Sequence, residues 1–299
     1  MSMRSPIKRL IRRWVMPSLS YRARKRIPFT SRKAECLRKS KEDIANVTRK
    51  CVMLSSKGFQ QSSNSNFQYD RLNWATNEIR LIRIRPPATM MVSSEMDRIS
   101  CEITSVSLDE KPDYIALSYA WEDTTLARPL LLNGRSFHAT ASLDVALRQI
   151  RKMQFEGRMS RLQYIWVDAI CINQEDEVEK SWQVQNMNRI FEEAEYTLVW
   201  LGPSSAESRK AMEALEHVGL TIKSGTDPLD NAALNTVYLM SKLYHDFSSS
   251  LKDLLTRSWW KRIWVVQEFA LAKDIVFLCG EAQLSWRPCF LALESLEKF

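Results

Sequence analysis

The stretch at residues 164–174, Tyr-Ile-Trp-Val-Asp-Ala-Ile-Cys-Ile-Asn-Gln, carries the side chains best suited to chemistry. Its first four residues form an apolar run with the β-branched and aromatic content of a buried strand. Asp168 follows that run, and the amides of Asn173 and Gln174 come shortly after. A buried strand that brings a carboxylate and two amides to one edge of a sheet is how open α/β folds build binding sites.

Each of these polar residues also has a structural interpretation. Asp168 can bind ribose hydroxyls or an arginine, but it can also accept backbone N–H groups of the following loop, which is the favoured role. Asn173, Gln174 and Gln183 can hydrogen-bond a ligand or fix the junction between loop and helix. For these three amides the structural role is again favoured.

A second group of side chains follows the apolar strand expected at residues 113–119. Nucleotide ligands of open α/β sheets lie beside such a strand end. The candidate ligand-binding residues here are therefore Ser118, Tyr119, Trp121 and Glu122. The sequence contains neither G-x-G-x-x-G nor G-x-x-x-x-G-K-[ST], which disfavours Rossmann and P-loop nucleotide binding. The three histidines are isolated, so the sequence predicts no metal site and no Ser–His or Cys–His pair.

Alternating strands and helices must position these residues. The apolar runs predict strands at 113–119, 164–168, 196–201 and 274–279, and the helical periodicity predicts helices at 142–153, 177–194 and 259–272. Ser142 can cap the first of these helices. The buried stripe of the second is expected to contain Val178, Trp182, Met187, Ile190, Phe191 and Ala194. Short links between such elements predict an α/β fold, a mostly parallel sheet flanked by helices.

Three additions to this core are expected. Alternating residues at 78–85 and 99–103 predict an N-terminal β-hairpin, and Asn133-Gly134 predicts a second hairpin within 130–137. Residues 205–256 indicate a helical insertion with a loop at 223–230. A last helix is predicted at 288–298, next to the end of the sequence. The C-terminal part of the domain can therefore be incomplete.

The composition is that of a globular protein. The 299 residues are 45% hydrophobic and 26% charged, and no run approaches eighteen apolar residues, so no transmembrane helix is predicted. The six cysteines include no C-x-x-C pair, which argues against a disulfide framework and for a reducing, cytoplasmic setting. Cys171 and Cys279 lie in apolar runs and are expected to be core thiols.

The basic charge is concentrated at the N-terminus. Residues 1–50 contain 16 of the 43 basic residues and 3 of the 35 acidic ones. Residues 51–299 therefore contain 27 basic and 32 acidic residues. Nucleic-acid binding by the folded part therefore has little electrostatic support. The polar residues 60–68 predict a linker between a basic tail (1–70) and the folded domain (71–299).

The tail contains a basic amphipathic segment at residues 5–16. One helical face carries five apolar side chains and four basic ones lie off it: Ile7, Leu10, Ile11, Trp14 and Val15, then Lys8, Arg9, Arg12 and Arg13. Such a segment can lie on an anionic membrane or direct mitochondrial import, and the basic run at 22–26 can direct nuclear import. A disordered, solvated tail is the competing interpretation.

Five motifs together resemble the fungal heterokaryon incompatibility (HET) domain. They follow the family's order between residues 79 and 286, and as they stand here they are YIALSYAW (114–121), IWVDAICINQ (165–174), QVQNM (183–187), VWLG (199–202) and RIWVVQE (262–268). One departure is Glu122, where the family more usually has glycine. This substitution is expected to affect the loop after the first core strand.

The resemblance implies a role in non-self recognition and programmed cell death, and a distant kinship to the TIR fold with its flavodoxin-like sheet. Some TIR domains hydrolyse NAD at the nicotinamide–ribose bond with a glutamate in a Trp-x-x-x-Glu segment, and residues 264–268 have that form. NAD is then a substrate, and no bound cofactor is expected. Nicotinamide leaves as a neutral group, so the chemistry mainly needs an ionised carboxylate that stabilises the oxocarbenium-like transition state.

Glu268 is thus the first candidate for catalysis and Asp168 the second, and Trp264 can stack on the nicotinamide or adenine ring. The alternative is that Glu268 pairs with Arg262 or Arg257 and ties its helix to the core. At the level of the domain, an NAD-cleaving enzyme competes with a non-enzymatic module whose output is assembly. The expected partners are further copies of the chain or another incompatibility protein, and membrane contact is expected only through the amphipathic segment.

Overall fold

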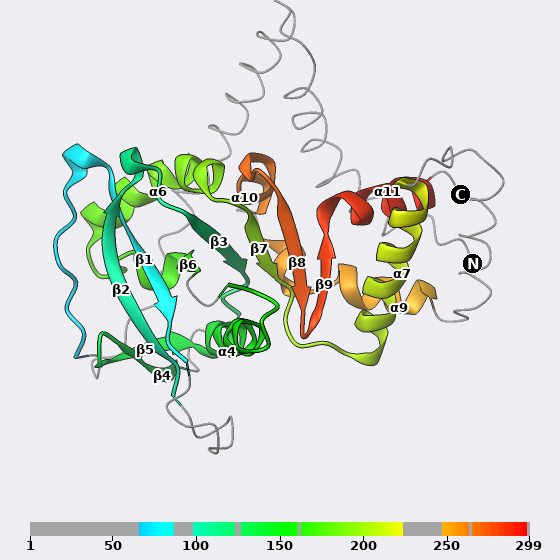
Figure 1. Ribbon diagram of the computed structural model, residues 1–299, viewed down its shortest axis with the longest axis horizontal. Coiled ribbons are helices and arrows are strands. Elements are labelled where there is room, and N and C mark those ends of the chain that lie inside the picture. Colours follow the sequence, from blue (N-terminus) through cyan, green and yellow to red (C-terminus); the bar gives the residue numbers. More distant parts are fainter. Residues whose placement is uncertain are drawn as a thin grey trace, which may run out of the picture. The chain divides into compact units, whose positions relative to one another are not determined.

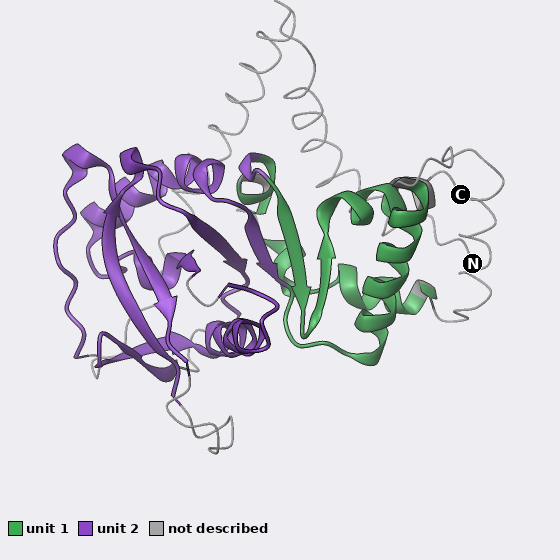
Figure 2. Ribbon diagram, in the orientation of Figure 1, with its two compact units in different colours: residues 1–47, 201–270, 274–299 green, residues 48–200, 271–273 purple. Residues whose placement is uncertain are grey.

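The computed structural model describes residues 66–86, 98–122, 127–160, 163–223, 247–262 and 265–297 (Figure 1). These residues form two compact units: unit 2 contains 66–200 and 271–273, and unit 1 contains 201–270 and 274–297 (Figure 2). Outside the described residues lie the amphipathic segment at 5–16, the basic run at 22–26, most of the loop expected at 223–230, and Trp264. None of the helices within the described ranges is long and apolar enough to cross a membrane.

Unit 2 is built on a mixed sheet. Its described strands lie in the order β5-β4-β2-β1-β6-β3-β7. In chain order they are β1 (Glu78–Ile84), β2 (Ser100–Ser107), β3 (Tyr114–Tyr119), β4 (Ala127–Leu132), β5 (Arg135–Thr140), β6 (Tyr164–Trp166) and β7 (Thr197–Trp200).

The core of this sheet is parallel. Strand β3 lies between β6 and β7 and runs parallel to both. Since β3, β6 and β7 come first, second and third in the chain, their spatial order is 2-1-3, as at the start of the flavodoxin-like order. All residues of β3 and β7 are buried, which explains why both segments are almost continuously apolar in the sequence. The predicted α/β class is confirmed.

Antiparallel strands extend the sheet beyond β6. Strand β1 pairs antiparallel with β2 and with β6, and β4 pairs antiparallel with β5. The β4–β5 turn is the predicted Asn133-Gly134, with φ angles of 48° and 78° as a two-residue hairpin turn with left-handed central residues requires. Strand β2 joins this hairpin to the rest through a short parallel pairing with β4.

Helix α6 (Glu177–Glu193) covers the face of the sheet toward which Tyr114 and Trp166 point. The Tyr114 hydroxyl donates to the Ile190 carbonyl at 2.7 Å, and the Trp166 ring packs edge-on against Phe191 with centroids 5.6 Å apart. The predicted stripe is only partly confirmed: its C-terminal members are buried, but Val178 is 63% exposed and Trp182 is half-buried. The reason is that the first turns of the helix point Glu179 and Gln183 inward instead.

Helix α4 (Ala141–Phe155) follows β5 and buries the predicted stripe of Leu143, Ala146, Leu147, Ile150 and Met153. Its cap is Thr140, whose side chain accepts the Leu143 N–H, so the assignment of Ser142 as the cap is wrong. The Ser142 hydroxyl donates instead to the Ala120 carbonyl at 2.8 Å, which ties the start of α4 to the loop after β3. Short elements complete unit 2: η2 (Trp74–Thr76), η3 (Leu108–Glu110) and α5 (Asp168–Cys171).

Unit 1 combines an antiparallel hairpin with helices. The described elements are α7 (Ala206–Lys223), α9 (Phe247–Leu255), η4 (Ser258–Lys261), α10 (Val265–Leu271, which ends in unit 2), β8 (Ile275–Cys279), β9 (Ala282–Ser285) and α11 (Trp286–Glu297). Helices α7 and α9 lie in the predicted insertion. The single helix expected at 259–272 is wrong, because Arg262 is extended between η4 and α10 while Trp259 and Trp260 are both buried against Phe277.

Candidate functional site

The carboxyl ends of β3 and β6 bring two predicted site residues together. The indole N–H of Trp121 donates to Oδ2 of Asp168 at 3.0 Å, and the Ala169 N–H donates to Oδ1 at 2.8 Å. Asp168 begins the short helix α5 and is half-buried. Adjacent parallel strands end at the same edge of a sheet, which is why residues 47 positions apart in the chain meet here.

The predicted amides contact the protein itself. The Gln174 side chain donates to the Asp168 carbonyl at 2.9 Å, and the Asn173 side chain accepts the Glu175 N–H at 3.2 Å. Gln183 is 0% exposed and donates to the Glu78 carbonyl at 3.3 Å, which places it between α6 and β1. Gln174 therefore lies beside Asp168, whereas Gln183 is part of the packing of α6 on the sheet.

At the end of β3, Ser118 and Tyr119 are almost fully buried, with 2% and 1% of their surface exposed. As consecutive strand residues they point to opposite faces of the sheet. The exposed Glu122 follows Trp121 and has a φ of 50°. It therefore keeps the left-handed backbone that glycine adopts easily, at the position where the resemblance expects glycine.

Replacing Glu122 by glycine is expected to stabilise unit 2. A side chain in the left-handed region costs roughly 1–2 kcal/mol, and the greater freedom of glycine in the unfolded chain offsets part of that gain. We expect a net increase of about 0.5–1 kcal/mol in the free energy of unfolding, measured by urea denaturation. Glu122→Ala keeps the Cβ atom and removes the charge, so equal gains in both variants would assign the effect to charge and contradict this prediction.

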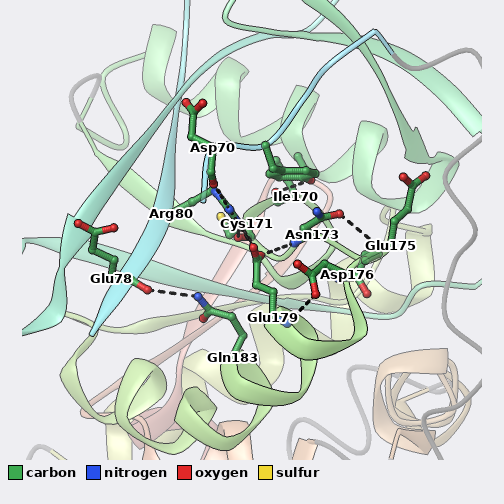
Figure 3. A network of polar contacts seen from close by, with 12 residues as sticks. Asp70, Glu78, Arg80, Ile170, Cys171, Asn173, Glu175, Asp176, Glu179 and Gln183 are labelled. Atoms are coloured by element: carbon green, nitrogen blue, oxygen red, sulfur yellow. Dashed lines mark hydrogen bonds and ion pairs between the residues drawn. The ribbon is translucent and has the colours of Figure 1, made fainter. Parts of the chain in front are cut away.

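An ion pair holds the loop after α5 in place (Figure 3). Arg80 of β1 and Glu179 of α6 are 3% and 4% exposed, and their charged groups meet at 2.6 and 3.0 Å. Arg80 also donates to the Cys171 carbonyl (3.1 Å) and the Asp70 carbonyl (2.6 Å), and Glu179 accepts the Asn173 N–H (2.8 Å). These two side chains, absent from the predicted site, fix the backbone that follows Asp168.

Residues before β1 belong to the same network. The Tyr69 hydroxyl donates to the Ile170 carbonyl at 2.9 Å, and the Arg80 guanidinium lies 4.6 Å from the centroid of the Tyr69 ring. Burial raises the pKa of this hydroxyl, so it stays a hydrogen-bond donor at neutral pH. The segment that precedes β1 thus supports the same loop as the ion pair does.

The buried thiols are suited to packing and not to nucleophilic chemistry. Cys171 and Cys279 are 0% exposed, as predicted for core thiols. Burial raises the pKa of Cys171 to about 12, so the thiol is protonated at neutral pH. Across the described ranges, no three His, Cys, Asp or Glu side chains gather in a way that could hold a metal ion.

Glu268, the first candidate for catalysis, lies in α10 and within unit 1. It is 2% exposed, and its two carboxylate oxygens each accept a bond of 3.2 Å from the two terminal nitrogens of Arg262. Arg257, the other partner considered, binds the carbonyls of Leu201 (2.9 Å) and Pro203 (2.7 Å) instead. Asp168 and Glu268 belong to different units, so the arrangement of Asp168 with Trp121 and Gln174 stands by itself.

Comparison with known proteins adds a family to this geometry. The family model described as "Heterokaryon incompatibility protein (HET)" matches residues 114–268. The chain is 32% identical over 254 residues to "Heterokaryon incompatibility protein 6, OR allele" of Neurospora crassa, a match that covers 73% of this chain and 36% of that relative. The chain thus spans little more than a third of the length of the curated relative. No solved structure shows a significant match.

Proposed function

Because this chain belongs to the heterokaryon incompatibility family, we propose that it acts as a signalling domain of fungal non-self recognition and programmed cell death. The observation that carries the proposal is the extent of the family match. It begins at Tyr114, the first residue of β3, and ends at Glu268. It therefore contains the parallel core and both candidate carboxylates.

The finer proposal is that self-association of the domain switches on cleavage of NAD at the nicotinamide–ribose bond. The 2-1-3 order of β6, β3 and β7 supports a nucleotide site at the carboxyl ends of these strands, where the strand order reverses. Trp121 offers a ring beside the carboxylate of Asp168 at this edge. An aromatic ring can stack on a nicotinamide ring, and a carboxylate can accept hydrogen bonds from ribose hydroxyls.

Asp168 is the candidate carboxylate of this edge in unit 2, whereas Glu268, the first candidate, lies in unit 1 and would itself stabilise the positive charge that develops on the ribose when neutral nicotinamide departs. The Arg262 guanidinium occupies both of its oxygens. A substrate must therefore take the place of Arg262 before the carboxylate can face the ribose. The state described here corresponds, in this proposal, to the resting domain.

A second candidate function is a non-enzymatic assembly module, and the same ion pair favours it. A carboxylate that is 2% exposed and bound through both oxygens has a complete structural role in joining η4 to α10. In this case recognition is transmitted by contacts between copies or with another incompatibility protein, and Glu268 contributes to folding only.

Nicotinamide release from NAD by the full chain at high protein concentration separates the two candidates. We expect release to rise more than linearly with protein concentration and to fall at least about 100-fold in Glu268→Gln. Glu195→Gln, at an exposed glutamate of unit 2, is the matched control and should behave as the parent.

Equal release by the parent and Glu268→Gln would remove Glu268 as the catalyst. If neither protein releases nicotinamide under conditions in which light scattering shows oligomers, the assembly module is the better description. Thermal denaturation of each variant shows whether a loss of activity reflects unfolding.

A further inference from the structure

Unit 2 exposes an apolar surface formed by α6 and η2. The indole rings of Trp74 and Trp182 stack with centroids 6.0 Å apart and an interplanar angle of 15°. Trp74 is 43% exposed, and Val178, one helical turn before Trp182, is 63% exposed. These three residues are called the tryptophan surface below. Two stacked indoles beside an exposed aliphatic side chain are typical of a protein contact, because aromatic anchors dominate interface energetics.

One end of the tryptophan surface is acidic. Glu175, Asp176 and Glu177 directly precede Val178, and the Glu177 side chain is 79% exposed. A single lysine, Lys180, pairs with Glu177 at 3.4 Å. The partner that fits is therefore a segment with an apolar stripe flanked by positive charges.

This chain contains such a segment at residues 5–16. It has five apolar side chains at helical spacing and four basic ones beside them, and residues 1–34 contain eleven Lys and Arg and no acid.

The chain between this segment and the folded unit is long enough to reach a neighbouring molecule. Forty-nine residues, 17–65, separate the segment from the first described residue. A random coil of that length spans about 40 Å on average. The contact itself is small, so it favours assembly only where copies are concentrated.

We propose that the tryptophan surface binds residues 5–16 of a second copy of this chain. Each copy then offers one surface and one segment, so the interface is head-to-tail and assembly continues beyond the dimer. The proposal rests on the self-association part of the proposed function and not on NAD cleavage. Through this contact, copies of the chain that are brought close together would assemble.

Two complementary variants of the full chain test the interface by sedimentation velocity. Val178→Lys places a positive charge on the surface, and Leu10→Asp with Trp14→Asp disrupts the segment. Each variant alone is expected to self-associate at least tenfold more weakly than the parent. An equimolar mixture should form a dimer and nothing larger, because one intact surface and one intact segment remain. Val145→Lys, at a valine of α4 that is 39% exposed, is the matched control.

Several outcomes would overturn the proposal. A parent that stays monomeric at every concentration excludes the interface, and segment variants that assemble like the parent indicate a symmetric contact between surfaces. If the mixture forms no dimer although each variant melts like the parent, residues 5–16 do not bind the tryptophan surface of another copy. They then act within their own chain. Segment variants that lose only binding to phosphatidylcholine–phosphatidylserine vesicles assign it to membranes. A mixture that dimerises without releasing nicotinamide leaves the interface standing and contradicts the enzyme alone.

Discussion

A Gly219→Ala variant is expected to lose about 3 kcal/mol in the free energy of unfolding, at the upper end of the overpacking range. Gly219 lies in α7, and a Cβ atom there would meet the Pro288 carbonyl oxygen of α11 at 2.0 Å and its carbonyl carbon at 2.4 Å. These are backbone atoms, so the clash cannot be relieved by a change of rotamer. The two helices must separate by about 1 Å or more to restore ordinary contact distances.

The sign of this effect makes the test decisive. Helix propensity alone predicts that Gly→Ala inside a helix stabilises by about 1 kcal/mol. We expect instead a fall in melting temperature of roughly 6–12 °C, measured by calorimetry. The neighbouring residue Leu220 is 47% exposed, so Leu220→Ala should change the melting temperature little. A Gly219→Ala protein as stable as the parent would contradict the close crossing of α7 and α11.

Removing the arginine of the Figure 3 network is expected to destabilise unit 2 by about 3–5 kcal/mol. Arg80→Met leaves the Glu179 carboxyl, which is 4% exposed in the parent, without its guanidinium partner, and it removes the donors to the Cys171 and Asp70 carbonyls. Adding Glu179→Leu removes the uncompensated charge, so the double variant should recover most of the loss. Urea denaturation of the two single variants and the double variant gives the coupling energy directly.

Arg83 provides the control on the same strand. It pairs with Glu102, and their side chains are 32% and 36% exposed. Exposed ion pairs contribute about 0–1 kcal/mol, so Arg83→Met should have little effect. Similar losses for Arg80→Met and Arg83→Met would show that the burial of the Arg80–Glu179 pair is not what stabilises the domain.

The sequence predicts the parallel core because its strands are buried on both faces. Such strands are nearly continuous apolar runs, and the predicted ends of β3 and β7 lie within one residue of the observed ends. The Asn-Gly turn and the stripe of α4 were equally clear, since both depend on neighbours in the chain. The meeting of Trp121 with Asp168 follows from strand order and needs no finer information.

What the sequence does not predict is the pairing of charges over long separations. Arg80 resembles the other arginines of its strand, but Ile79 and Leu81 on either side are both 0% exposed. Only the place of β1 inside the sheet shows that Arg80 must be buried and needs a partner 99 residues away. Because Glu179 faces Arg80, α6 is oriented about its axis so that Val178 lies in solvent and not in the expected buried stripe. For Glu268, the sequence named Arg262 and Arg257 as partners, and the geometry selects Arg262.

The antiparallel pairing of β1 with β6 determines which fragment of this chain can be expressed without exposing an edge of the sheet. The family match begins at Tyr114, whereas β1 ends at Ile84. A fragment trimmed to the match would leave one side of β6 as an open edge, with unpaired N–H and C=O groups next to apolar side chains. Open edges of this kind favour aggregation. The expression boundary for this chain therefore belongs before β1, at or ahead of residue 66.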